Sequence, residues 1–189
     1  MKINGNEIIP GTLIEYKNGL YRTIKVQHVK PGKGGAFAQA ELKEIRTGQK
    51  LNERFRSDEK VEKVRLEQLP HTFLFSDVDE HTFMNSENFE QIALSTEIVG
   101  EETVPFLQDG MKVEIEFYED EIISVTIPER IIMKIVEADA VVKGQTASSS
   151  YKPAKLENGV AVLVPPHIEA GTKVVINTTT GEYMERAKD

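Results

Sequence analysis

The sequence predicts an all-β protein built from three small barrels. Apolar and polar residues alternate along many short segments, and glycine-containing turn signals separate those segments. The chain has 189 residues but only 8 Phe, 5 Tyr and no Trp, a supply of aromatic residues that suits small cores of β-branched side chains. We place the three parts at residues 1–65, 66–128 and 129–189.

The first part, residues 1–65, is expected to form short strands joined by tight turns. Turn signals stand at Asn-Gly 18–19 and Thr-Gly 47–48. Small apolar residues alternate with polar residues over 36–42, which predicts a strand with one buried face. The segment 57–69 fits neither the helical nor the strand period, so no element is predicted there.

A β-hairpin is predicted in the middle part. Apolar and polar residues alternate over 111–117 and again over 123–127, and the acidic triplet 119–121 interrupts them. Because proline cannot donate a hydrogen bond to a strand ladder, Pro128 ends the second strand and marks a joint.

One short helix is predicted between Ser86 and Leu94. Phe89, Ile92 and Ala93 fall at i, i+3 and i+4, the spacing of one helical face. Ser86 is a residue type that caps the start of a helix.

The third part is expected to be β-rich as well. Alternating or β-branched apolar residues occupy 131–135, 160–164 and 173–176. The run 144–150 between them contains only small and polar residues. Such a run buries too little apolar surface to become ordered, which predicts a mobile loop.

Charge is divided unevenly between the three parts. The net charge is −8, yet residues 1–65 carry 14 Lys and Arg against 8 Asp and Glu. Residues 66–128 carry 1 against 15, and residues 129–189 carry 8 against 8. Acidic surfaces are common in soluble proteins. The division favours a basic module that approaches phosphate, joined to an acidic module that does not.

The absence of cysteine rules out disulfide bonds and indicates a reducing, cytoplasmic compartment. The first residues lack the long apolar run of a secretory signal. No segment reaches the length needed to cross a bilayer, so no membrane partner is expected.

The most informative segment is the glycine-rich run around one lysine. Gly32, Gly34 and Gly35 surround Lys33, and Pro31 stiffens the entry to the turn. The run predicts an ammonium group held out at a hairpin tip. A lysine in such a turn is usually a solvated tip and nothing more. The run is no P-loop either, because Lys33 is followed by glycine instead of Ser or Thr.

Three separate segments resemble the elongation factor P family of bacterial translation factors. The run from Lys30 to Phe37 is similar to the family's tip loop, in the version with lysine at the apex. Residues 152–171 reproduce the spacing of the family's C-terminal signature, and residues 181–186 give a third match. The resemblance therefore covers all 189 residues.

The resemblance implies an N-terminal SH3-like barrel of the KOW type, followed by two OB-fold barrels in an L-shaped arrangement. It implies a translation elongation factor that binds the 70S ribosome between the peptidyl and exit sites and relieves stalling at consecutive prolines. Such a factor positions peptidyl-tRNA with little chemistry of its own, so no catalytic residue, cofactor or metal is expected. The expected state is a monomer that contacts peptidyl-site tRNA and ribosomal RNA.

The resemblance also assigns roles to single residues. Lys33 would be extended by a lysine-modifying enzyme, within the loop formed by Pro31, Gly32, Gly34 and Gly35. Five residues are expected on the small-subunit side. Gly144, Gln145 and Thr146 belong to the loop that approaches the exit-site codon, and the other two are Tyr183 and Arg186. From charge alone, predicted contacts to tRNA or ribosomal RNA phosphates are Lys25, Lys30, Arg54 and Arg56.

The chain departs from the family pattern at two places. Gln145 stands where the family usually has Asp, which leaves the pattern of codon contacts open. Asn177 and Thr179 stand where Asp and Arg are often found, which predicts weaker small-subunit contacts. Without the resemblance, Tyr183 and Arg186 would be expected to be a packed aromatic ring and a solvated charge.

Two other functions compete with this interpretation. An enzyme is disfavoured because the four histidines are scattered and no cysteine is present. The acidic run 77–81 predicts a turn and lacks the spacing of a calcium loop. A general RNA-binding β-barrel protein is the stronger alternative. A general binder should lose affinity gradually as basic residues are removed, whereas a translation factor should lose function at Lys33 with little loss of ribosome affinity.

Overall fold

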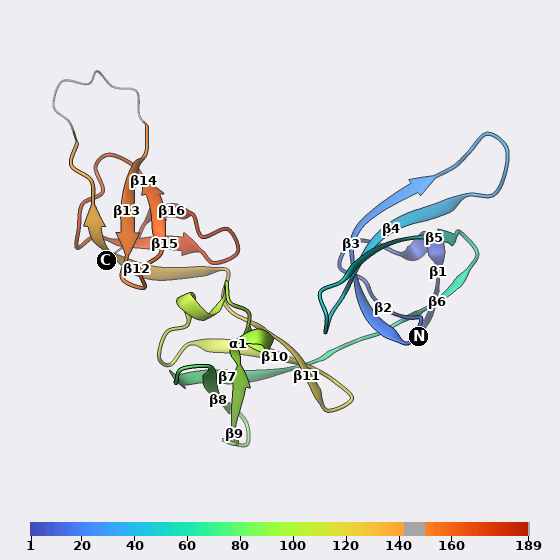
Figure 1. Cartoon of the computed structure of the whole chain (residues 1–189), viewed down its shortest axis with the longest axis horizontal. Coiled ribbons are helices and arrows are strands. Elements are labelled where there is room, and N and C mark those ends of the chain that lie inside the picture. The colour runs from blue at the N-terminus through green and yellow to red at the C-terminus, as the bar shows by residue number, and fades with distance from the viewer. Residues whose placement is uncertain (142–149, 189) are drawn as a thin grey trace. The chain divides into compact units, whose positions relative to one another are not determined.

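The computed structural model describes residues 1–141 and 150–188, and strands dominate it (Figure 1). Sixteen strands form three sheets, one of six strands and two of five. Contacts between residues divide the chain into a first unit, Met1–Glu67 with Phe117–Ile123, and a second unit, Gln68–Glu116 with Ser124–Asp189. The all-β prediction is confirmed. Within the described residues, no helix is long and apolar enough to span a membrane.

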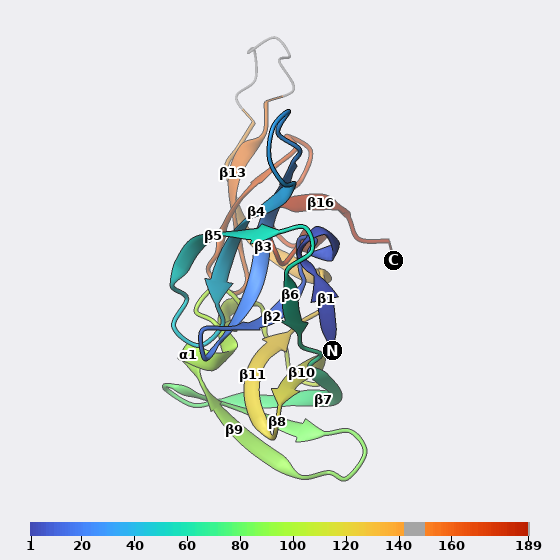
Figure 2. The ribbon, with the colours of Figure 1, turned by 90° about the vertical axis from the view of Figure 1, so that its right-hand side faces the viewer.

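The first sheet is curled and has the order β1-β6-β2-β3-β4-β5 (Figures 1 and 2). Its elements are β1 (Lys2–Asn4), a 3-10 turn η1 (Gly5–Glu7), β2 (Leu13–Tyr16), β3 (Gly19–Val29), β4 (Phe37–Glu44), β5 (Lys50–Arg56) and β6 (Lys60–Lys63). The strand β6 lies in the segment for which the sequence predicted no element. The two predicted turns join β2 to β3 and β4 to β5.

Seven buried side chains form the core of this curled sheet: Ile3, Ile8, Ile14, Ala40, Leu42, Phe55 and Val61. The alternation over residues 36–42 thus buries Ala38, Ala40 and Leu42, as predicted. The ring of Tyr16 packs edge to face against the buried ring of Phe55, with the two ring centroids 5.3 Å apart.

Close backbone approach requires glycine at Gly5 in η1. Its N–H donates to the carbonyl of Glu59 at 2.9 Å, and the next residue, Asn6, donates to the carbonyl of Ser57 at 3.3 Å. A Cβ atom on Gly5 would lie 2.2 Å from the carbonyl oxygen of Arg56. The turn η1 therefore rests directly on the end of β5, which positions that strand.

The second sheet has the order β11-β10-β7-β8-β9. Its region contains β7 (Glu67–Ser76), β8 (Glu80–Asn85), β9 (Gln91–Ser95), helix α1 (Thr96–Val99), a 3-10 turn η2 (Val104–Phe106), β10 (Lys112–Tyr118) and β11 (Glu121–Thr126). The predicted hairpin over residues 111–127 is confirmed as β10 and β11. The rings of Phe73 and Phe83 pack in the core with centroids 5.5 Å apart.

The helix predicted from Ser86 to Leu94 is wrong. The segment is a turn followed by β9, and Phe89 has a left-handed φ of +63° that no α-helix contains. Two hydrogen bonds to the side chain of Asn85, from the N–H groups of Glu87 at 2.8 Å and Asn88 at 3.3 Å, hold the turn. Local hydrogen bonds to an Asn side chain thus outweigh the weak helical period.

A turn also occupies the acidic run, where the N–H of Asp77 donates to the carbonyl of Glu80 at 2.8 Å. The buried ring of His81 bonds through Nδ1 to the Ser76 hydroxyl at 2.7 Å and through Nε2 to the Thr96 hydroxyl at 2.9 Å. Burial lowers the pKa of His81. In the described part of the chain, no cluster of three acidic, His or Cys side chains has the geometry of a metal site.

The third sheet has the order β14-β13-β12-β15-β16. Its strands are β12 (Arg130–Ala138), β13 (Lys152–Leu156), β14 (Ala161–Val164), β15 (Lys173–Asn177) and β16 (Tyr183–Arg186). Ile131, Met133 and Ile135 are all buried, as their alternation predicted. The loop predicted over residues 144–150 lies, except for Ser150, outside the described residues.

Candidate functional site

The glycine-rich run forms the tip of the long β3–β4 hairpin, which projects from the first sheet (Figure 1). The last paired residues are Val29 and Phe37, and the chain between them turns without strand pairing. Six consecutive residues at the tip are exposed: Lys30, Pro31, Gly32, Lys33, Gly34 and Gly35. Because three of these residues are glycines, the tip has few side chains that could shield the amine of Lys33 from solvent.

One glycine of the tip has a backbone conformation that other residues avoid. Gly34 has a φ of +109°, which strains any residue with a Cβ. Gly32 has no atom within 4 Å of the position its Cβ would take, so its lack of a side chain leaves open space beside the turn. Conformation and access are therefore separate reasons for glycine in this loop.

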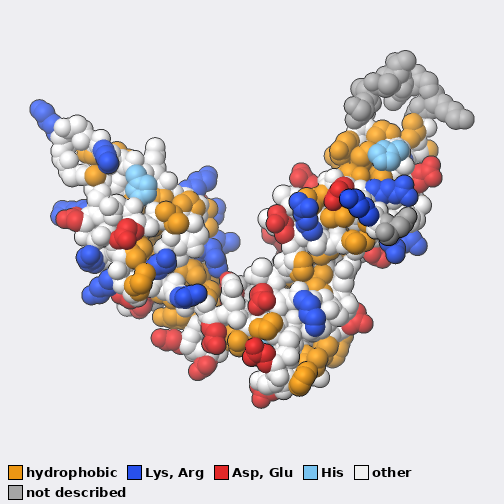
Figure 3. Space-filling view, turned by 180° about the vertical axis from the view of Figure 1, so that it is seen from behind, with side chains coloured by type: hydrophobic (Ala, Val, Ile, Leu, Met, Phe, Trp, Pro, Cys, Tyr) orange, Lys and Arg blue, Asp and Glu red, His pale blue; other side chains and the backbone are white. Residues whose placement is uncertain are grey.

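Three of the four predicted phosphate contacts share one face of the hairpin and its neighbour strand. Strand register pairs Phe37 with Arg56 and Gln39 with Arg54, and residues directly opposite in an antiparallel pair point to the same side. Lys25 pairs with Glu41 on that same side. Lys30, the fourth residue, is exposed in the tip loop. The outer face of β3, β4 and β5 thus collects basic side chains, and Figure 3 shows such side chains spread over the first unit.

The acids of the basic module make contacts that leave five basic residues of the tip and this face without an ion-pair partner among the described residues. Six of the eight Asp and Glu residues in 1–65 accept hydrogen bonds or form ion pairs. Their partners are the Asn4 N–H for Glu7, Lys50 for Glu41, the Thr47 N–H for Glu44, Lys17 for Glu53, the Arg56 N–H for Glu59 and the chain's N-terminal amine for Glu62. No ion pair within the described residues reaches Lys25, Lys30, Lys33, Arg54 or Arg56. Glu41 lies on the same face, but it pairs with Lys50, so the charges of these five residues stay uncompensated by ion pairs.

A hollow of about 560 Å³ opens at the root of the tip loop, and we call it the root hollow. It is lined by Gly35, Ala36, Phe37, Arg54, Arg56, Ser57 and Asp58. The guanidinium carbon of Arg54 lies 3.9 Å from the centroid of the Phe37 ring, a cation–π contact. A hydrogen bond of 3.0 Å from the Ser57 N–H to the Ala36 carbonyl fixes its edge.

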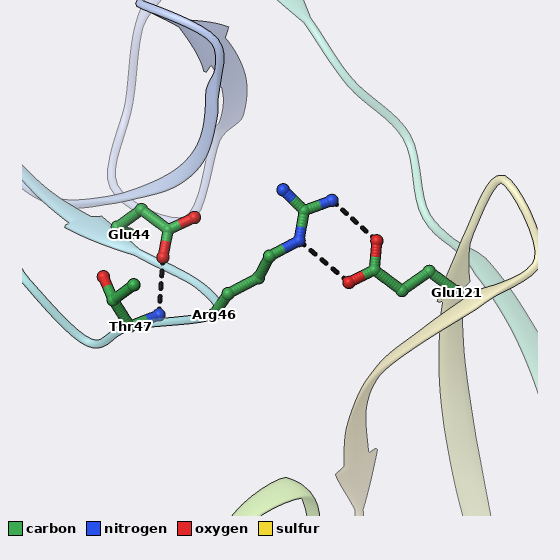
Figure 4. Close-up of polar contacts among 4 residues, drawn as sticks. All are labelled: Glu44, Arg46, Thr47 and Glu121. Atoms are coloured by element: carbon green, nitrogen blue, oxygen red, sulfur yellow. Dashed lines mark hydrogen bonds and ion pairs between the residues drawn. The ribbon is translucent and has the colours of Figure 1, made fainter.

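An ion pair in the first unit ties the β4–β5 turn to the tip of the β10–β11 hairpin (Figure 4). Arg46 donates through Nε and Nη2 to the two carboxylate oxygens of Glu121, at 2.8 and 2.7 Å. The hydrogen bond from Arg46 lowers the pKa of Glu121. Burial would raise the pKa of nearby Glu44, but hydrogen bonds from the Thr47 and Arg46 backbone bring it below its usual value. Both acids thus stay ionised and hold the turn.

Of the residues predicted for the small-subunit side, the structure describes Tyr183 and Arg186, both in β16. The Tyr183 ring packs edge to face on Tyr151 with centroids 6.3 Å apart, and burial raises its pKa. Arg186 is exposed. Gly144, Gln145 and Thr146 lie outside the described residues.

Asn177, one of the departures from the family pattern, has a structural role in the turn that follows β15. Its side-chain oxygen accepts hydrogen bonds from the N–H groups of Thr179 at 2.8 Å and Thr180 at 3.0 Å. It therefore holds the turn between β15 and β16, an Asx turn that the sequence analysis did not predict.

Phe37, Ser57 and Asp58 line the root hollow, and the sequence did not predict them as members of a site. The period-two pattern of β5 was a usable signal, because it places Arg54 and Arg56 on the face opposite the buried Phe55. No local pattern reveals that this face meets Phe37, since that depends on the register between β4 and β5.

Family models match nearly the whole chain. Residues 4–61 match the model described as elongation factor P (EF-P) KOW-like domain, and residues 66–125 match the elongation factor P (EF-P) OB domain. Residues 131–186 match the model for elongation factor P, C-terminal. The first two matches name the predicted KOW-type domain and the first predicted OB domain, and the third covers the C-terminal part of the chain.

Curated relatives are similar over their full length. Elongation factor P of Roseobacter denitrificans is 56% identical over 186 residues, which cover 98% of this chain and 99% of the relative. Elongation factor P of Zymomonas mobilis is 56% identical over 187 residues, which cover 99% of this chain and all of the relative. The solved structure of eukaryotic translation initiation factor 5A from Methanococcus jannaschii has a similar fold, with a TM-score of 0.54 and 21% identity over 68% of this chain and 92% of that one.

Proposed function

Because the chain belongs to the elongation factor P family and is therefore a translation elongation factor that acts on the ribosome, we propose that it binds between the peptidyl and exit sites and relieves stalling at consecutive prolines. Proline is a poor acceptor in peptide bond formation, because its amine is secondary and its ring restricts approach. The reaction is then sensitive to how peptidyl-tRNA is held. A bound factor accelerates it by positioning that tRNA, without a catalytic residue of its own.

The observation that carries the proposal is the exposed, unpaired amine of Lys33 at the end of a two-stranded arm. The arm extends from the strands whose outer face carries Lys25, Arg54 and Arg56. Such a basic face is suited to contact the phosphates of an acceptor stem. Lys33 then reaches towards the CCA end of the tRNA. Glycine on both sides allows close approach of the loop to RNA.

We further propose that a lysine-modifying enzyme extends Lys33 and that the factor works as a cytoplasmic monomer. The open space around Gly32 gives an enzyme access to the amine. Intact mass of the protein from its native host, with fragmentation localised to the tip peptide, tests the modification. An unmodified mass would contradict it.

Contacts on the small-subunit side are assigned to Tyr183, Arg186 and the loop with Gly144, Gln145 and Thr146. The packing of Tyr183 on Tyr151 gives the end of β16 a fixed shape from which the exposed Arg186 projects. The acidic stretch 66–128 is proposed either to face basic ribosomal protein or to stop the factor from binding RNA indiscriminately. Neutralising several of its acids should weaken ribosome affinity or increase binding to unrelated RNA; no change in either would contradict this role.

The decisive experiment compares Lys33→Ala with Lys33→Arg in a reconstituted translation system. Lys33→Ala should slow synthesis of a Pro-Pro-Pro reporter and spare a reporter without it. Lys33→Arg keeps the charge but removes the modifiable amine, so it separates the two contributions. Lys2→Ala, which removes an exposed lysine of β1 outside the basic face, is the control. Equal slowing of both reporters by Lys33→Ala would refute the proposal. A gradual loss of RNA affinity at every basic residue would favour a general RNA-binding protein.

A further inference from the structure

The root hollow combines a flat cationic stack, a free cation and a free acceptor. Its volume of about 560 Å³ lies within the range of small-ligand sites. It lies at the base of the loop that carries Lys33, on the basic face of β3, β4 and β5. These features make the hollow more than a groove between two exposed strands.

The flat element is the pair formed by Phe37 and Arg54. Their contact of 3.9 Å places the guanidinium carbon of Arg54 over the aromatic ring of Phe37, and both side chains line the hollow. Aromatic rings and guanidinium planes are the surfaces on which unpaired nucleic-acid bases stack. Bases inside a duplex are already stacked, so this element selects single strands.

The remaining polar groups select a nucleotide over a simple anion. Arg56 lies opposite Phe37 in the strand register and has no ion-pair partner among the described residues, so it is available for a phosphate. Asp58 also lines the hollow, and its carboxylate would repel an isolated anion. A carboxylate instead accepts a hydrogen bond from a ribose hydroxyl, as in dinucleotide sites.

We propose that the root hollow binds one unpaired nucleotide of RNA. The base stacks on the layer formed by Phe37 and Arg54, the phosphate pairs with Arg56, and Asp58 accepts a hydrogen bond from the ribose 2′-hydroxyl. The inference rests on the proposed function, which brings the tip loop to the single-stranded 3′ end of a tRNA. The 2′-hydroxyl contact makes the site selective for RNA over DNA.

The test is an NMR titration of the full chain with the trinucleotides r(CCA) and d(CCA) and with inorganic phosphate. We expect r(CCA) to shift the amide signals of Ala36, Phe37 and Ser57 in a saturable way and d(CCA) to bind more weakly. Phosphate alone should leave these signals nearly unchanged. The wild-type titration needs no variant, so a folding defect does not affect it. Saturable shifts elsewhere only, or equal shifts with phosphate, would overturn the proposal.

Variants then assign the contacts. Phe37→Leu should weaken r(CCA) binding roughly 5- to 150-fold, the range that corresponds to the loss of one stacked base. Asp58→Ala, which removes the acceptor, should abolish the preference for r(CCA) over d(CCA), while Glu169→Ala, the same kind of truncation at an exposed site outside the hollow, should keep it. An unchanged preference in Asp58→Ala would refute the ribose contact.

The translation assay separates this inference from the proposed function. If Phe37→Leu still rescues the Pro-Pro-Pro reporter and r(CCA) leaves the hollow unshifted, the inference fails and the proposed function stands. If Lys33→Ala spares that reporter while r(CCA) shifts the hollow, the proposed function fails and the nucleotide site stands.

Discussion

Replacing Gly5 with alanine should destabilise the first unit strongly, because the added methyl group has no space. Its Cβ would lie 2.2 Å from the Arg56 carbonyl oxygen and 3.1 Å from both the carbonyl carbon of Arg56 and the Cβ of Phe55. Two of these three atoms belong to the backbone of β5, so a side-chain rotation cannot relieve the overlap. Overpacking in a core costs about 1–3 kcal/mol, and a displaced backbone places Gly5→Ala near 3 kcal/mol.

Urea denaturation followed by far-UV circular dichroism measures this cost. Gly32→Ala is the matched control, since its Cβ meets nothing within 4 Å and its φ is not positive. We expect the control to unfold at the wild-type urea concentration or slightly above it, because alanine restricts the unfolded chain. The movement of β5 in Gly5→Ala should also shift the amide signals of Arg54 and Arg56. Wild-type stability of Gly5→Ala would refute the close approach on which this reasoning depends.

Three further predictions concern ionisable and aromatic groups. A double-mutant cycle on Arg46 and Glu121 should give a coupling energy of about 0.5 kcal/mol, which is typical of exposed ion pairs. The coupling energy should shrink in 1 M salt and as pH falls through the lowered pKa of Glu121, and a value unaffected by salt would contradict the ion pair. Burial lowers the pKa of His81, so its contribution to stability should be full above about pH 6.5, the pKa of histidine in an unfolded chain, and should be lost as pH drops through the folded pKa. Urea titrations at two pH values check this, and His81→Gln should remove most of the dependence. Tyr183→Ala should cost about 1–2 kcal/mol through lost packing on Tyr151 while Tyr183→Phe stays near wild type, and a large loss in Tyr183→Phe would show that the hydroxyl group matters instead.

The sequence predicted the strands well where one face is buried. The alternation over 131–135 and in the hairpin over 111–127 carried enough signal, because a period of two survives when one side packs on a core. The helix expected at 86–94 failed for a different reason. The side chain of Asn85, outside the periodic segment, holds the backbone in a turn, and apolar spacing contains no information on such hydrogen bonds.

The candidate site was predictable only in part. The exposed tip with Lys33 follows from composition, since glycine and proline dictate a turn without tertiary contacts. The root hollow does not follow from composition, because Phe37 and Arg54 meet through the register between two strands. The ion pair between Arg46 and Glu121 joins residues 75 positions apart, and their charges alone do not single out that pairing.

The tip loop and the barrel beneath it are under different physical constraints. Core residues such as Phe55 are fixed by packing, and Phe55→Ala would cost about 3–5 kcal/mol whatever the function. At the tip, Lys33 and Gly32 are exposed, so replacing either residue with alanine should leave the free energy of unfolding within about 0.5 kcal/mol of wild type. Gly34→Ala differs, since its φ of +109° costs strain even in open space. A large loss of translation activity without loss of stability at Lys33 is therefore the combination that only a function of the tip itself explains.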